Sequence, residues 1–285
     1  MKIAIIGANG QLGTDLVEVL SKEHHVIPLT HGDIEVEDFE SCRTLLDVEP
    51  AIIINTAAFH RVDLCESNPD KTFAVNSIGA KNLAVIASEL SAINIYISTD
   101  YVFDGEKKDP YTELDQANPL MTYGISKLAG ESYTKIYSDK HYIFRIASVF
   151  GKAGASGKGG NFIETMISKA RAGEALKVVN DMLMTPTYTK SAAKIIASVV
   201  EKELPYGIYH ITNQPQCSWF DFTKGIFKLL DLRVAVEPVS MHAFESPVKK
   251  PKNSALVSAK LPDFGIQLEN WENSLMDYLG EKKYL

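Results

Sequence analysis

Several features are scarce in or missing from this 285-residue sequence. It has only three cysteines (Cys42, Cys65 and Cys217) and no CxxC pair, so we expect no disulfide framework and no structural zinc site. It has no excess of basic residues. The net charge of −7 excludes the positive surface that nucleic-acid binding requires. No apolar run approaches about 18 residues and no signal peptide opens the chain, so we expect a soluble, cytoplasmic protein without a membrane partner.

The opening residues carry the strongest local pattern. Residues 3–6 form an unbroken apolar run, which predicts a strand buried on both faces of a parallel sheet. Gly7, Gly10 and Gly13 follow, and residues 11–21 are predicted as an amphipathic helix. Glycines in this context let a backbone approach a pyrophosphate, and the helix N-terminus attracts an anion. The pattern therefore predicts a dinucleotide site, and a packing turn that binds nothing is the alternative.

Apolar strands and amphipathic helices then alternate along the chain. Strands are predicted at 25–30, 51–54, 93–98 and 142–150, and helices at 35–50 (Phe39, Leu45 and Leu46 inward) and 71–90 (Phe73, Val75, Ile78, Leu83 and Ile86 inward). This order predicts an α/β fold with a doubly wound parallel (Rossmann) sheet. We expect residues 1–150 to bind NAD(P), with 176–212 returning to that domain, and 151–175 and 213–285 to form a smaller C-terminal α/β substrate lobe. The glycine-rich segment 151–160 is predicted either as a mobile segment over a substrate or as a plain loop.

The chemistry is expected where the strand at 93–98 ends, because ligands of such sheets bind beyond the carboxyl ends of the strands. Thr99 and Asp100 lie there. Tyr123 and Lys127 are four residues apart on a predicted helix, so they share one face. A lysine ammonium beside the phenol is expected to lower the pKa of Tyr123, which could then protonate a developing alkoxide during hydride transfer. YxxxK alone is common by chance, but after a dinucleotide motif it indicates a reductase.

Five motifs, GANGQLG, INTAA, STDYVFDG, YGISKLAGE and FRIASVFG, follow the order and spacing of extended short-chain dehydrogenase/reductases that act on nucleotide sugars. Through GQLG, STDYVFDG, NDMLMTPT and KKPKNSAL, the chain resembles the dTDP-4-dehydrorhamnose reductases over nearly its whole length. The resemblance implies hydride transfer from NADPH or NADH to C4 of dTDP-4-dehydro-L-rhamnose. The product, dTDP-L-rhamnose, would serve cell-surface polysaccharide synthesis. The implied partner is a dTDP-sugar, and a homodimer is an assembly that the resemblance allows.

The resemblance also implies roles for individual residues. Thr99 would hydrogen-bond the keto group, Tyr123 would protonate O4, and Lys127 would hold the nicotinamide ribose. Together with Tyr123 and Lys127, the cofactor site would comprise Gly7, Asn9, Gly10, Gln11, Leu12, Gly13, Asp33, Ile34, Ala57, Ala58 and Phe59. The substrate site would comprise Thr99, Asp100, Tyr123, Ser148, Asn161 and Lys250. No metal ligand is predicted.

Three positions depart from the family pattern. Thr30 stands where an aspartate is often found, so the choice between NADH and NADPH stays open. Ser148 replaces a tryptophan and Lys250 replaces an arginine, which changes the expected sugar pocket and phosphate contact. Two other functions also stay open: a nucleotide-sugar epimerase or dehydratase of the same superfamily, and a non-catalytic subunit similar to methionine adenosyltransferase β.

Overall fold

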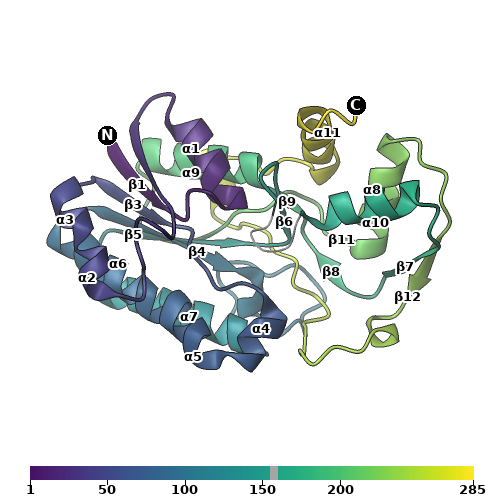
Figure 1. Cartoon of the computed structure of the whole chain (residues 1–285), viewed down its shortest axis with the longest axis horizontal. Helices are drawn as coiled ribbons and strands as arrows, with labels where there is room; N and C mark the ends of the chain where they lie inside the picture. Colours follow the sequence, from purple (N-terminus) through teal and green to yellow (C-terminus); the bar gives the residue numbers. More distant parts are fainter. Residues whose placement is uncertain (155–159) are drawn as a thin grey trace.

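A six-stranded parallel sheet forms the centre of the computed structural model, which describes residues 1–154 and 160–285 (Figure 1). The strands run in the order β10-β5-β4-β3-β1-β2. Their bounds are β1 Lys2–Ile6, β2 His25–Leu29, β3 Ile52–Asn55, β4 Ile93–Thr99, β5 His141–Ile146 and β10 Gly207–His210. The strand order reverses direction between β1 and β3, which is the point where doubly wound sheets bind ligands. The predicted α/β sheet is therefore confirmed.

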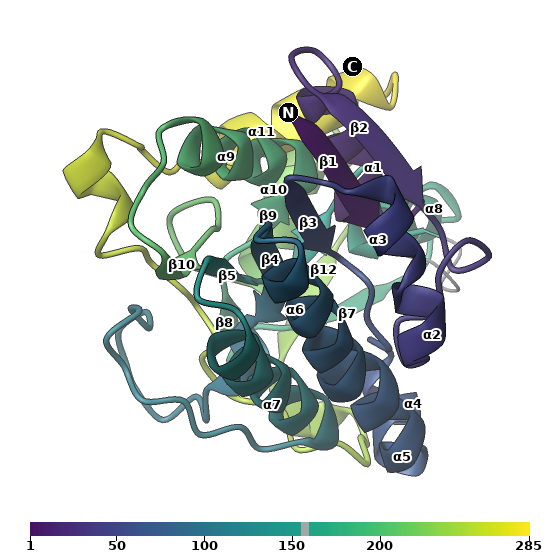
Figure 2. The same cartoon turned by 90° about the vertical axis from the view of Figure 1, so that its left-hand side faces the viewer.

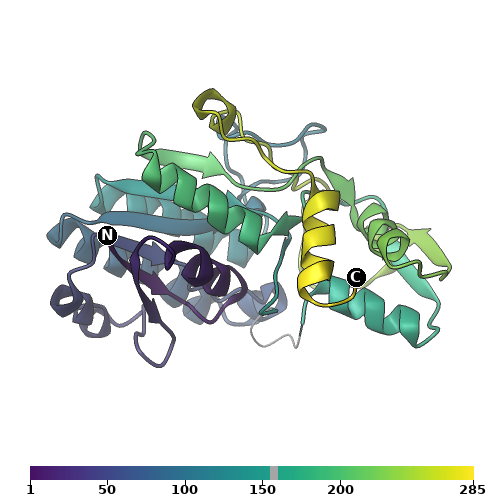
Figure 3. The same cartoon turned by 90° about the horizontal axis from the view of Figure 1, so that it is seen from above.

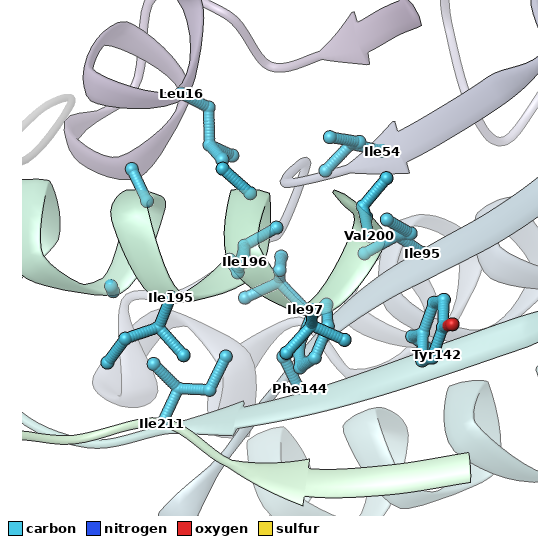
Figure 4. Packing of buried hydrophobic residues seen from close by; sticks show 14 of the residues in the cluster. Leu16, Ile54, Ile95, Ile97, Tyr142, Phe144, Ile195, Ile196, Val200 and Ile211 are labelled. Atoms are coloured by element: carbon cyan, nitrogen blue, oxygen red, sulfur yellow. The ribbon is translucent and has the colours of Figure 1, made fainter. Parts of the chain in front are cut away.

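Helices cover both faces of this sheet (Figure 2). One face carries α1 (Gln11–Leu20) and α9 (Thr189–Glu201), and the opposite face carries α6 (Gly79–Glu89) and α7 (Thr122–Tyr137). Shorter helices lie beside α6 and α7: α2 Phe39–Cys42, α3 Thr44–Val48, α4 Val62–Ser67, α5 Pro69–Phe73 and the π-helical turn η1 Ala74–Ile78. Figure 4 shows Leu16 of α1 and Ile196 of α9 packed over strand residues such as Ile97. This double cover explains the continuous apolar run of β1.

Two helices differ from their sequence-based predictions. The predicted helix 35–50 is divided into α2 and α3, and Phe39 is 36% exposed although it was expected inside. The predicted helix 71–90 contains the π-helical turn η1. A π-helical turn adds a residue and rotates the positions around it, so Ile78 faces solvent at 39% exposure. Leu45, Leu83 and Ile86 are fully buried, as expected.

The predicted single strand 142–150 is interrupted. β5 ends at Ile146, and Val149–Phe150 form β6, which leaves the main sheet and pairs with β9 (Thr187–Tyr188). Ser148 lies between them with φ of +43°, in the left-handed region. This conformation turns the chain out of the sheet, so the prediction of one continuous strand was wrong.

The second part of the chain builds a smaller lobe with its own core (Figure 3). Its other elements are α8 Phe162–Arg171, β7 Leu176–Val179, β8 Leu183–Met184, β11 Cys217–Ser218, α10 Trp219–Leu229, β12 Val236–Val239 and α11 Trp271–Glu281. β7 pairs with β12, so of residues 176–212 only α9 and β10 return to the main sheet. Leu261 and Ile266, which were assigned to the lobe, pack in the core under α1 and α9.

Part of the glycine-rich segment predicted at 151–160, residues 155–159, lies outside the described residues. In the described ranges, no helix combines the length and the apolar character that crossing a bilayer demands. The same ranges contain no group of three or more His, Cys, Asp or Glu side chains arranged to hold a metal ion.

Candidate functional site

A tight glycine turn follows β1 at the strand-order reversal. Gly7 has φ of +80°, and the N–H groups of Gly7 and Ala8 both donate to the Leu29 carbonyl oxygen, at 2.8 and 3.1 Å. A Cβ atom at Gly13 would lie only 2.2 Å from the Gly7 carbonyl oxygen, and one at Gly7 would lie 2.6 Å from Thr56 Oγ1. Larger side chains would therefore push the turn and α1 apart.

The N-terminus of α1 opens directly from this turn. In the described part of the chain, no side chain caps it, and its first turn has no acidic residue. The Oε1 atom of Gln11 is buried without a hydrogen-bond partner, and Asn9 is exposed beside it. Free N–H groups and a bare glycine surface are what a pyrophosphate needs. Gly7, Asn9, Gly10, Gln11 and Gly13 thus fit the diphosphate of a dinucleotide.

The other predicted cofactor residues lie near the same sheet edge, but they differ in how far their side chains are buried. Ala57, Ala58 and Phe59 follow β3 and are half-buried. By contrast, the side chains of Leu12 and Ile34 belong to the core, at 6% and 3% exposure, so only their backbones could face a ligand.

The turn after β2 is held by Asp33. Its Oδ2 atom accepts hydrogen bonds from Thr30 N and Thr30 Oγ1, at 2.8 and 2.7 Å. These bonds hold the pKa of Asp33 below its ordinary value. Asp33 is exposed, so it lies where a ribose could approach, but its carboxylate is already bonded to Thr30. Thr30, the departure from the family pattern, is therefore part of the turn itself.

Thr99, Tyr123 and Lys127 meet at the carboxyl end of β4. Thr99 is the last residue of β4, and Tyr123 lies in the first turn of α7. The Thr99 hydroxyl lies close enough to Tyr123 to lower its pKa, and it donates to Asp100 Oδ1 at 2.9 Å. The Tyr123 ring contacts Tyr101 edge-on, at 6.3 Å between centroids. Because the strands are parallel, this group shares the sheet edge with the Gly7 turn.

Lys127 is oriented differently from the expectation. Its ammonium donates to the Ile97 carbonyl oxygen at 2.5 Å and lies 4.1 Å from the centroid of the Tyr96 ring. Burial lowers the pKa of Lys127 to about 7, although the Glu131 carboxylate opposes this shift. Burial, followed by the charge of Asp100, raises the pKa of Tyr123, while Thr99 lowers it. Lys127 does not lower the pKa of Tyr123 here, so that prediction was wrong, because the ammonium is directed at Ile97.

The predicted substrate residues are placed unequally around this group. Asp100 is 4% exposed, and burial raises its pKa to about 6. Ser254, which the sequence did not single out, lies close enough to Asp100 to lower its pKa, against the effect of burial, and belongs to the same C-terminal segment as Lys250. A Cβ at Gly105, in the loop that follows β4, would lie 2.5 Å from Pro251. The C-terminal segment therefore packs closely against this loop.

Ser148 and Asn161 sit at the junction with the lobe. Ser148 occupies the turn between β5 and β6. Asn161 caps α8: its Oδ1 accepts from Glu164 N at 3.1 Å, and its Nδ2 donates to Tyr278 Oη at 2.9 Å. In the described ranges, no hydrogen bond joins Asn161 or Lys250 to Thr99, Tyr123 or Lys127.

Glu66 is a second residue that sequence reasoning missed. The carboxylate of Glu66, on α4, accepts hydrogen bonds from Thr122 N at 2.7 Å and from Thr122 Oγ1 at 2.8 Å. Thr122 begins α7, and the residue before it, Met121, offers no side-chain cap. Glu66 therefore caps the helix that carries Tyr123 from 56 residues away, a distance at which no local sequence motif exists.

Replacing this cap should loosen the start of α7. We expect Glu66→Ala to lower the free energy of unfolding by about 1–2 kcal/mol, measured by urea denaturation, because two α7 donors lose their acceptor. Asp63→Ala is the matched control, since Asp63 lies on the same helix but is exposed and pairs with Arg61 at 3.4 Å, away from Thr122. Equal effects of the two substitutions would contradict the capping role.

Comparison with known proteins yields a consistent group of relatives. The sequence model of the RmlD substrate binding domain family matches residues 1–284. The chain is 35% identical to the spore coat polysaccharide biosynthesis protein SpsK of Bacillus subtilis, covering 99% of this chain and 98% of that protein.

Two solved structures extend this likeness to three dimensions. A dTDP-4-dehydrorhamnose reductase from Clostridium acetobutylicum has a TM-score of 0.94 at 38% identity, covering 99% of this chain and 100% of that one. The dTDP-4-dehydrorhamnose reductase of Bacillus anthracis, solved in complex with NADP, has a TM-score of 0.93 at 35% identity, covering 98% and 99%.

Proposed function

Because this chain belongs to the dTDP-4-dehydrorhamnose reductase family, we propose that it reduces dTDP-4-dehydro-L-rhamnose to dTDP-L-rhamnose with NADPH or NADH. One observation carries the proposal: Thr99, Tyr123 and Lys127 are grouped at the carboxyl end of β4, on the sheet edge that also holds the Gly7 turn. A proton donor and a dinucleotide cradle at one edge are the two parts that a carbonyl reductase requires.

The cofactor is assigned to residues whose surroundings fit it. The Gly7 turn and the open N-terminus of α1 would hold the diphosphate, Ala57 to Phe59 would line the adjoining edge, and Lys127 would hold the nicotinamide ribose. When bound, NADPH or NADH supplies the hydride that reduces C4. The Lys127 ammonium has three N–H donors, and one of them bonds the Ile97 carbonyl oxygen, so the others can serve the ribose.

The protein side of the reaction is a proton delivery. Because burial raises the pKa of Tyr123, its phenol is protonated at neutral pH and can donate to O4 as negative charge develops there. The Thr99 hydroxyl, which now donates to Asp100, would turn to hydrogen-bond the same oxygen. Asp100, Ser148, Asn161 and Lys250 are proposed to surround the dTDP-sugar, with Lys250 toward the phosphates as a point charge.

The buried Asp100 carboxyl group should make the free energy of unfolding depend on pH. Its pKa is raised from 3.8 to about 6, so its ionised form destabilises the folded protein increasingly as pH rises through this interval. We expect Asp100→Asn to raise the free energy of unfolding relative to the unaltered protein, by about 3 kcal/mol at pH 7 and little at pH 4. Urea denaturation at both pH values measures the difference, and a difference that does not grow with pH would contradict the assignment.

The direct test is the loss of nicotinamide absorbance when the purified protein is mixed with dTDP-4-dehydrorhamnose, compared between NADPH and NADH. Consumption of either cofactor supports the reductase. Tightly bound NAD⁺ without net consumption of NADH or NADPH would favour an epimerase or dehydratase instead. Co-purification with a synthetase, and no oxidation by any keto sugar, would favour a regulatory subunit. The homodimer and the cytoplasmic location stay predictions.

A further inference from the structure

We propose that Glu131 is a positioning residue of the reductase, which keeps Lys127 charged and holds α7 in place on β4. The inference rests on the proposed function. Three residues of α7, Tyr123, Lys127 and Glu131, recur every four positions and so line one face of the helix. They face three consecutive residues of β4: Lys127 bonds with Ile97, Glu131 bonds with Ser98, and Tyr123 lies beside Thr99.

The carboxylate of Glu131 is fully buried, and both of its oxygens accept hydrogen bonds. Ser98 Oγ donates to its Oε1 at 2.6 Å, Arg145 Nε donates to the same oxygen at 2.8 Å, and Arg145 Nη2 donates to Oε2 at 2.7 Å. Its side chain has 0% exposure, and that of Arg145 has 4%. Ser98 and Arg145 are register partners in β4 and β5. One carboxylate therefore ties α7 to two neighbouring strands, at the residue next to Thr99.

Glu131 lies one helical turn after Lys127 on α7. The elements packed around Lys127 carry several titratable or charged groups, which include Tyr123 and Glu131 on α7, Tyr96 on β4, Arg145 on β5, Cys65 and Glu66 on α4, and Asp100 and Tyr101 just after β4. Among the groups that the structure describes, Glu131 is the one whose charge favours the protonated form of Lys127, against the effect of burial. Removing that charge should favour the neutral amine.

A purely structural ion pair would behave differently. Buried pairs that serve only packing change stability when they are altered, whereas a group that acts through Lys127 must also change the pH at which Lys127 loses its proton. The pH dependence therefore separates the two roles, and a matched carboxylate is available as a control. Glu113 accepts hydrogen bonds from Ser258 Oγ at 2.5 Å and from His210 N at 2.9 Å. Like Glu131 it is a hydrogen-bonded carboxylate, but its partners do not lie on α7.

The experiment compares Glu131→Gln with the unaltered protein over pH 6–10, using dTDP-4-dehydrorhamnose and NADPH. We expect the alkaline loss of kcat to move to lower pH by about one unit, so that kcat falls about tenfold at pH 8 and much less at pH 6. A second readout needs no turnover: the Kd of NADPH, measured by its fluorescence, should begin to rise at the same lower pH. Glu131→Asp keeps the charge and should keep the original pH profile.

The controls make each outcome decisive. Glu113→Gln should lower the melting temperature and leave the pH profile unmoved. If Glu131→Gln fails to fold because Arg145 is left without its counter-ion, Glu131→Gln combined with Arg145→Met removes both charges, and a smaller shift in the same direction is expected because loss of the Arg145 cation favours protonated Lys127. If kcat of the folded variant is lost at the same alkaline pH as in the unaltered protein, the inference is overturned and the proposed function is unaffected. Absence of turnover by the unaltered protein would instead overturn the proposed function, and the inference with it.

Discussion

Tyr123→Phe is expected to reduce kcat by about a thousandfold while changing the Kd of NADPH less than threefold. The substitution removes only the hydroxyl, so the ring can keep its edge-on contact with Tyr101. Loss of a positioned proton donor costs roughly 10²–10⁴ in rate. Steady-state oxidation of NADPH by dTDP-4-dehydrorhamnose measures kcat, and fluorescence titration without the sugar measures binding.

The matched control for this prediction is Tyr133→Phe. Tyr133 lies on the same helix, is half-buried and contacts Tyr137 at 6.1 Å between ring centroids, away from Thr99. It should retain nearly full turnover. If Tyr123→Phe also turned over the keto sugar at a near-normal rate, Tyr123 would not be the proton donor, and the assigned mechanism would be wrong.

Gly13→Ala is expected to weaken NADPH binding by at least about a hundredfold and to lower the free energy of unfolding by about 2–3 kcal/mol. The added Cβ would lie 2.2 Å from the Gly7 carbonyl oxygen and 2.8 Å from Ala8 Cα. Both are backbone atoms that cannot rotate away, so α1 has to move off the turn that would hold the diphosphate. Fluorescence titration with NADPH and urea denaturation give the two quantities.

Two other glycines calibrate this effect. A Cβ at Gly10 would lie 3.3 Å from the Gly7 carbonyl oxygen, so Gly10→Ala should cost less than Gly13→Ala. A Cβ at Gly280, on α11, would meet nothing within 4 Å, and Gly280→Ala should stabilise the protein by about 0.5–1 kcal/mol. Normal NADPH binding by Gly13→Ala would remove the glycine turn from the proposed cofactor site.

The sequence was most informative where structure depends on neighbouring residues. The buried β1, the glycine turn and α1 follow from the first 20 residues, because an apolar run, a φ above zero and an amphipathic period are local properties. The pairing of Tyr123 with Lys127 on one helix face follows from the helical repeat alone. The alternation of strands and helices likewise predicted the parallel sheet, since parallel strands need crossover connections.

Tertiary structure decided what depends on distant residues and on burial. The left-handed turn at Ser148 directs β6 into the lobe, and β7 pairs with β12, which begins 60 residues after β7 begins. The cap on α7 comes from Glu66, and Ser254 lies beside Asp100, although no short motif joins either pair. The direction of the Lys127 ammonium and the raised pKa of Tyr123 depend on how each group is desolvated. Residue spacing can place such groups on one face, but only the packed chain determines their charge and their partners.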